Sequence, residues 1–143
     1  MFIRIDQSSQ MPIYRQLRDQ IVAGIASGEL SPGEQLPSVR ALGTDLGINL
    51  HTVNKAYAVL RDEGYLVMRG RAGARVAAPS GGDAAVKRLA DGLGLLVAEF
   101  KAAGGTRKAF EKIAASELDR AFNDNAASRP TDATHVEGSD CHE

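Results

Sequence analysis

The sequence has few of the residues on which many other classes of protein depend. It contains no tryptophan, a single cysteine and only 5% aromatic residues in 143 positions. One cysteine, Cys141, cannot form a disulfide within the chain, so we expect a protein of the reducing cytoplasm. No uncharged apolar run approaches the roughly 20 residues that a membrane span requires. The N-terminal residues also lack the basic region and apolar run of a secretory signal.

Patterns of catalysis and metal binding are missing as well. There is no phosphate-binding glycine loop, and of the three histidines only His51 lies within the regions expected to fold. His135, Cys141 and His142 suggest a metal site as a weaker alternative, but structural zinc needs four well-placed ligands. We therefore expect no enzyme, no metal and no cofactor.

Charge is distributed unevenly, although the formal net charge is only −1. Residues 38–75 contain six basic residues against three acidic ones, whereas residues 126–143 contain one arginine against four acidic residues. A basic middle segment favours an acidic partner such as nucleic acid. The segment from 126 onward has no periodicity and the composition of a disordered polar tail.

Three short helices and a hairpin are expected in the first half of the chain. The run FIRI at residues 2–5 is typical of an edge strand. A first helix begins with Pro12 at its first helical position, and a second follows Ser38, its expected N-cap, and ends at Gly47. Residues 65–68 and 75–76 then predict two strands joined by a turn rich in glycine and arginine.

The third helix, at about residues 49–63, has an apolar face and a polar face. Its apolar face repeats at spacings of three and four and consists of Val53, Ala56, Tyr57 and Leu60. The polar residues of its first two turns, behind the expected N-cap Asn49, are His51, Thr52, Asn54 and Lys55. Three helices followed by a hairpin are typical of a winged helix-turn-helix, with residues 69–75 in the wing.

The polar cluster at the start of this helix suits the reading of DNA bases. A recognition helix enters the major groove with its first turns nearest the bases, and Thr, Asn and His are short enough to reach them. Arg40 in the preceding helix and Arg69 and Arg71 in the wing can bind phosphate on either side. Two alternatives are a merely solvated polar face and a winged helix that binds protein. The second would need an exposed apolar patch on this face.

A family resemblance supports the DNA-binding interpretation. The segment GELSPGEQLPSVRALGTDLGINLHTVNKAYAVLRDEGYLV resembles the DNA-binding domain of GntR-family bacterial transcriptional regulators, and PIYRQLRDQI is similar to their short YtrA-type branch. The resemblance runs from about Ile5 to Val76. It implies double-stranded DNA as partner and a homodimeric repressor on a palindromic operator. It implies DNA contacts from Arg40, Asn49, Leu50, His51, Thr52, Asn54, Gly70 and Arg71, to which Lys55 and Arg69 are added by position and charge.

The chain departs from the family pattern at several of these positions. Leu50 stands where many members have Arg or Pro, and an apolar side chain there suits a thymine methyl group. His51 replaces an Asn that is common in the YtrA branch, and the wing has Arg71 and Arg75 in place of a Gly and an aromatic residue. The resemblance therefore does not imply an operator sequence.

After a linker at residues 77–82, two more helices are expected. The first carries an a/d seam, and the second begins after Thr106 as N-cap. Two short helices have no core of their own, so we expect a homodimer interface, with burial on each other or on the first domain as alternatives. The interface residues are expected to be Val86, Leu89, Leu93, Leu96, Phe100, Phe110 and Ile113. Gly92 and Gly94 indicate either a close helix approach or a weak helix.

Together these patterns predict a mainly α fold with a small β wing. Residues 1–78 would form the winged helix-turn-helix domain, residues 79–125 a two-helix dimerisation region and residues 126–143 a polar tail. Two helices are not expected to enclose the roughly 300 Å³ of a typical ligand site. Any small-molecule effector is therefore expected at the dimer interface or between the domains.

Overall fold

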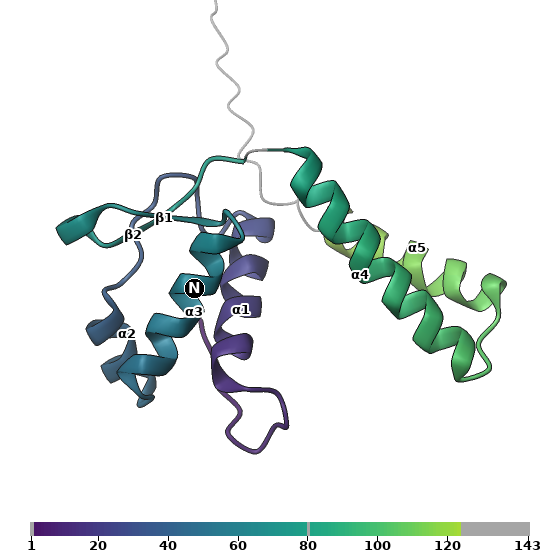
Figure 1. The fold of residues 1–143 in the computed structure, drawn as a ribbon, viewed down its shortest axis with the longest axis horizontal. Coiled ribbons are helices and arrows are strands. Elements are labelled where there is room, and N and C mark those ends of the chain that lie inside the picture. The colour runs from purple at the N-terminus through teal and green to yellow at the C-terminus, as the bar shows by residue number, and fades with distance from the viewer. Residues whose placement is uncertain (1, 80, 124–143) are drawn as a thin grey trace, which may run out of the picture.

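The computed structural model describes residues 2–79 and 81–123, so the expected tail at 126–143 lies outside the described residues. Within them it forms a mainly helical fold with a small two-stranded wing, as predicted (Figure 1). The elements are α1 (Ile13–Ser27), α2 (Val39–Leu46), α3 (Leu50–Asp62), β1 (Leu66–Met68), β2 (Ala74–Val76), α4 (Asp83–Ala102) and α5 (Arg107–Asn123). A short 3-10 turn, Gly70–Ala72, joins the antiparallel strands, which pair Leu66 with Val76 and Met68 with Ala74. No helix in these ranges is long and apolar enough to cross a membrane.

The hydrophobic core belongs to the first three helices and the hairpin. In Figure 1, α3 lies between α1 and α2, and the hairpin lies across one end of the helices. The apolar face predicted for the third helix is buried, with Val53, Ala56, Tyr57 and Leu60 at most 2% exposed. Leu17 and Ile21 of α1 pack against it in the same core. This packing holds α3 by one face and leaves its opposite face open.

Local capping interactions fix both ends of α2 and the start of α3, as the sequence predicted. Ser38 Oγ accepts a hydrogen bond from the Ala41 N–H at 3.1 Å, at the start of α2. Gly47 ends α2 with a φ of +63°, a left-handed conformation that glycine adopts without strain. Asn49 Oδ1 then accepts from the His51 N–H at 2.8 Å and begins α3.

The strand predicted at residues 2–5 is wrong. Ile3 and Ile5 do pack against the core, but the backbone beside them pairs with glutamine side chains of α1 rather than with another strand. The Arg4 N–H donates to Gln20 Oε1 at 2.8 Å, and the Asp6 N–H donates to Gln16 Oε1 at 2.9 Å. Because these amides satisfy the backbone, no partner strand is needed. Pro12 also lies one position earlier than expected, as the residue before the first turn of α1.

Helices α4 and α5 form an arm set apart from the first three helices (Figure 1). Neither helix has a buried residue. Their turn is held by the rings of Phe100 and Phe110, whose centroids are 5.8 Å apart, and by Thr106, whose Oγ1 accepts from the Ala109 N–H at 3.2 Å. A side chain at Gly105 would overlap the Phe100 ring.

The expectation that this helical pair encloses no ligand site stays a prediction, because the hollow between its helices is open to solvent. A hollow of about 510 Å³ lies at the turn, with Phe100 and Phe110 among its apolar walls and Lys101 and Arg107 among its charged ones. The two helices leave this space because they meet through the aromatic pair rather than along their whole length.

Candidate nucleic-acid interface

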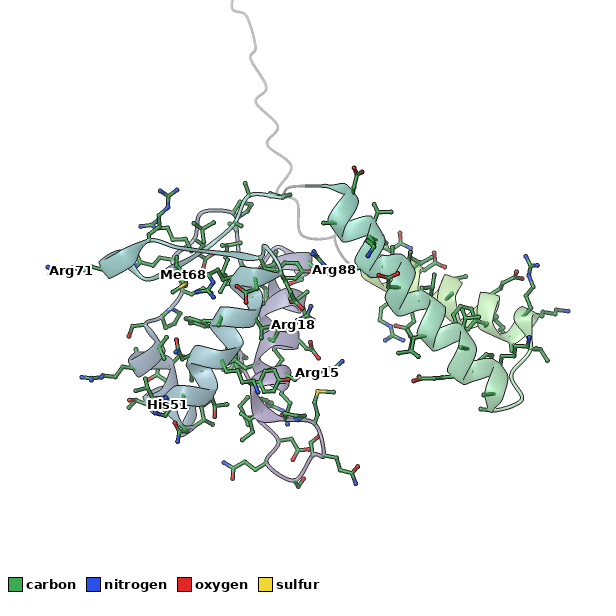
Figure 2. All side chains as sticks on the ribbon, in the orientation of Figure 1. Arg15, Arg18, His51, Met68, Arg71 and Arg88 are labelled. Atoms are coloured by element: carbon green, nitrogen blue, oxygen red, sulfur yellow. The ribbon has the colours of Figure 1, made fainter. Side chains whose placement is uncertain are left out.

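The start of α3 and the tip of the wing project from the same part of the molecule. Figure 2 shows His51 at the beginning of α3 and Arg71 at the end of the hairpin, both pointing away from the α4–α5 arm. Arg40 is exposed on α2, the helix that precedes the recognition helix. Basic and polar groups from α2, α3 and the hairpin can therefore contact the same ligand.

The first two turns of α3 present most of their side chains to solvent. Leu50, His51 and Asn54 are exposed, and Thr52 is half-buried. Asn49 differs from them because its side-chain oxygen is engaged in capping the helix. Because capping holds the Asn49 side chain against the backbone, His51, Thr52 and Asn54 are the groups best able to read a base edge.

Lys55 lies on the border of this face rather than at its centre. Its Nζ is 4.1 Å from the centroid of the Tyr14 ring on α1, a cation–π contact. The contact draws the positive charge toward α1. The sequence alone does not predict this contact, because no spacing rule connects residues of two different helices.

Arg40 shares a surface hollow with the start of α3. This hollow of about 270 Å³ lies in the α2–α3 turn and is lined by Arg40, Gly43, Thr44, Gly47, Ile48 and Leu50. Thr44 Oγ1 donates to the Arg40 carbonyl at 2.9 Å. Thr44 was not among the predicted site residues, although its position four residues after Arg40 places it on the same helix face.

The wing holds two exposed arginines on a compact turn. The Arg69 N–H donates to the Gly73 carbonyl at 2.9 Å, and Gly70 adopts a φ of +56° within the turn. Neither Arg69 nor Arg71 forms an ion pair with any described residue. Arg75, by contrast, donates to the Gly33 carbonyl at 3.1 Å and to Gln35 Oε1 at 3.3 Å. Arg75 thus joins the wing to the loop before α2.

Few features of the described residues support a metal site or a protein-binding winged helix. Over residues 2–79 and 81–123, no group of three or more His, Cys, Asp or Glu side chains is placed to hold a metal. His135, Cys141 and His142, the predicted weaker candidates, lie outside those residues. Leu50, at 44% exposed, is the one large apolar side chain of α3 that is exposed. A protein-binding apolar patch is therefore not present on this helix.

Comparison with known proteins decides the family. Residues 13–76 match the family described as bacterial regulatory proteins, gntR family. The transcriptional regulator Rv1152 of Mycobacterium tuberculosis is 36% identical over 89 residues, which cover 62% of this chain and 74% of Rv1152. The chain belongs to the GntR family. Members of this family are transcriptional regulators with a DNA-binding winged helix, and this GntR protein is one of them.

The GntR protein is of the YtrA type. The repressor YtrA of Bacillus subtilis is 44% identical to it over 70 residues, which cover 48% of this chain and 54% of YtrA. The solved structure of YtrA from Sulfolobus acidocaldarius, a GntR-family transcription factor, has 39% identity and a TM-score of 0.60. That match covers 71% of this chain and 99% of the Sulfolobus chain. The GntR protein thus spans about half of the Bacillus repressor and nearly the whole of the Sulfolobus chain.

Proposed function

We propose that this GntR protein is a cytoplasmic homodimeric repressor that binds a palindromic operator. One observation carries the proposal: short polar groups at the start of α3 and unpaired arginines of the wing are exposed together. Such a surface suits a helix in the major groove and a wing beside it. B. subtilis YtrA is a transcriptional repressor, which supports the same direction of regulation.

Within this proposal the side chains divide into two roles. Arg40, Arg69 and Arg71 bind phosphates and position the protein on the duplex. His51, Thr52 and Asn54 reach base edges and supply sequence discrimination. Lys55, held on Tyr14, contributes charge at the border with α1. Asn49 and Gly70 contribute mainly through the backbone shape of the helix start and of the wing.

A symmetric dimer is proposed through residues 79–125, with residues 1–78 as the DNA-binding domain. The support comes from the apolar seam of α4, where Val86 and Leu89 are 66% and 68% exposed in the single chain. Leu93, Leu96 and Ile113 are also at least 44% exposed. Burying such a seam against a second copy is favourable, at about 25 cal/mol for each Å² removed from water. A twofold axis then presents two recognition helices to two half-sites.

Binding measured on operator and scrambled DNA at several salt concentrations tests the division of roles. Arg40→Ala and Arg71→Ala should weaken both complexes alike and reduce the salt slope by about one unit per lost contact. Thr52→Ala, Asn54→Ala and His51→Ala should cost roughly 1 to 3 kcal/mol on the operator and little on scrambled DNA. Arg61→Ala is the matched control, since Arg61 is exposed at the far end of α3 and paired with Asp62. Equal losses on both DNAs for the three polar variants would refute base reading by α3.

Sedimentation of a charged seam variant tests the dimer. Leu93→Glu places a carboxylate in the proposed interface and should convert the dimer to a monomer. Ala98→Glu makes the same change on the opposite side of α4 and should leave the dimer intact, because Ala98 is an exposed position outside the seam. A Leu93→Glu protein that remains dimeric would show that the seam has another role.

A further inference from the structure

Leu50 is the one large apolar side chain of α3 that the fold leaves exposed. It is the first residue of α3 and is 44% exposed, whereas the apolar residues that anchor this helix are at most 2% exposed. Helix initiation does not depend on it, because Asn49 supplies the cap. An apolar side chain left at the leading end of a recognition helix is thus free to contact the ligand of that helix.

The surface beside Leu50 is shaped by residues with little side chain of their own. Gly43 and Gly47 form part of the hollow that Leu50 lines with Arg40. A Cβ at Gly43 would lie 3.2 Å from the Ile48 carbonyl oxygen, so the turn keeps this position without a side chain. Thr44 has its hydroxyl engaged with the Arg40 carbonyl. The hollow therefore offers apolar contact from Leu50 and Ile48 and one cation at Arg40.

This combination matches one nucleotide better than the others. In the major groove, the C5-methyl group of thymine is the apolar group that a base edge presents. The adjoining backbone phosphate would complement the guanidinium of Arg40, which forms no ion pair with any described residue. Resting on the proposed DNA-binding function, we infer that Leu50 reads a thymine in each half-site through its C5-methyl group, beside a phosphate held by Arg40.

Replacing thymine with uracil removes that methyl group and nothing else. Operator DNA is first selected from a random pool with the full chain, and each thymine of the selected site is then replaced by deoxyuracil in turn. With the natural protein, replacing the thymine at one position in a half-site should lower operator affinity about fourfold, as expected for a buried group of methylene size. The symmetric position in the other half-site should respond in the same way. Replacing both members of the pair should weaken binding about fifteenfold.

Variants of Leu50 assign the effect to this side chain. With Leu50→Ala, thymine and uracil operators should bind equally at the sensitive positions. Leu50→Gln keeps a good helix former and replaces the apolar end with an amide, so it should abolish the difference too, even if the alanine protein folds poorly. His51→Ala is the neighbouring control. It should lower operator affinity but leave the thymine-to-uracil ratio unchanged.

Two results would overturn the inference while leaving the proposed function intact. One is a selected operator with no thymine whose methyl group matters to the natural protein. The other is a methyl dependence that persists unchanged in both Leu50 variants, which would assign the contact to a different residue. If the selection enriches no sequence at all, the proposed function itself fails and the inference fails with it.

Discussion

Tyr57 combines a core position with a polar contact that ties α3 to the chain before α2. Its ring is 2% exposed, and its hydroxyl donates to the Pro37 carbonyl at 2.8 Å. A buried tyrosine usually finds a partner for its hydroxyl in this way. Burial raises the pKa of Tyr57 from 10.0 to about 12, because the charged phenolate would lose its hydration in the core. The contact fixes the recognition helix relative to the start of α2, where Ser38 and Arg40 lie.

Tyr57→Phe should lower the free energy of unfolding by about 1 kcal/mol at neutral pH, because the Pro37 carbonyl loses its donor. Above pH 10 the difference should shrink. The unfolded natural chain then releases the Tyr57 proton while the folded chain keeps it, so this contribution to stability is complete below pH 10 and is lost as pH rises toward 12. Urea unfolding of both proteins between pH 7 and 12 measures the difference. Curves that stay parallel across this range would contradict the assignment.

Among single residues, the caps could be predicted from the sequence and the partners of the long basic side chains could not. Ser38, Gly47 and Asn49 act on backbone groups within three residues of themselves, so their roles follow from local chain chemistry. Lys55 meets Tyr14, and Arg75 meets Gly33, each across a long stretch of sequence. Such pairings depend on how the helices pack. The sequence could therefore indicate a basic surface but not which of its charges are already engaged.

At the scale of elements, periodicity predicted the three helices and the hairpin because a buried face imposes it. The run at residues 2–5 shows where this reasoning fails. Ile3 and Ile5 alternate as in a strand and do face the core, but a strand also needs a neighbouring backbone. Here the neighbour is the side-chain amide of Gln20, which donates to the Arg4 carbonyl at 2.6 Å. An alternating pattern in the sequence does not show whether the backbone pairs with another strand or with side-chain amides.

Helix α4 runs without interruption through Gly92 and Gly94. A Cβ at either glycine would meet no atom within 4 Å in the single chain, so no close approach within the chain explains them. Gly92 lies next to the proposed seam, whereas Gly94 lies farther from it. We therefore expect the two positions to respond differently to the same substitution.

Gly92→Ala should strengthen α4 as an isolated helix by about 1 kcal/mol but weaken the dimer, because the added methyl group would meet the partner helix. Gly94→Ala is the matched control. It should stabilise α4 to the same extent without weakening the dimer. Circular dichroism and equilibrium sedimentation of both variants separate the two effects. Tighter dimers from both would mean that neither glycine lies at a close helix contact.

Considered as a whole, the molecule consists of a part with a core and a part without one. Among the described residues, the buried ones lie between Gln16 and Val76, and α4 and α5 contribute none. Because most helical stability in proteins comes from packing of an apolar face, we expect the arm to depend on burial of its apolar surface against another surface. The winged helix has no such dependence.

Thermal unfolding should therefore occur in two transitions. The transition of α4 and α5 should move to higher temperature as protein concentration rises, because association stabilises only the assembled state. The transition of the winged helix should not shift. Calorimetry over a wide range of protein concentrations checks this, and Leu93→Glu should remove the concentration-dependent transition while preserving the other. A single transition that shifts as a whole would indicate that the two parts unfold together.

The positions of the tyrosines make intrinsic fluorescence a local probe of this protein. All three, Tyr14, Tyr57 and Tyr65, lie in the winged helix, and the chain has no tryptophan. Intrinsic emission therefore reports on the DNA-binding half alone, and association of the arms is silent in it. Tyr14 is the most informative emitter, since the Lys55 ammonium rests on its ring and would change that ring's surroundings if it turned toward a phosphate. Phe122→Trp, at an exposed position of the arm, would add tryptophan emission. DNA binding and association of the arms could then be followed in the same sample.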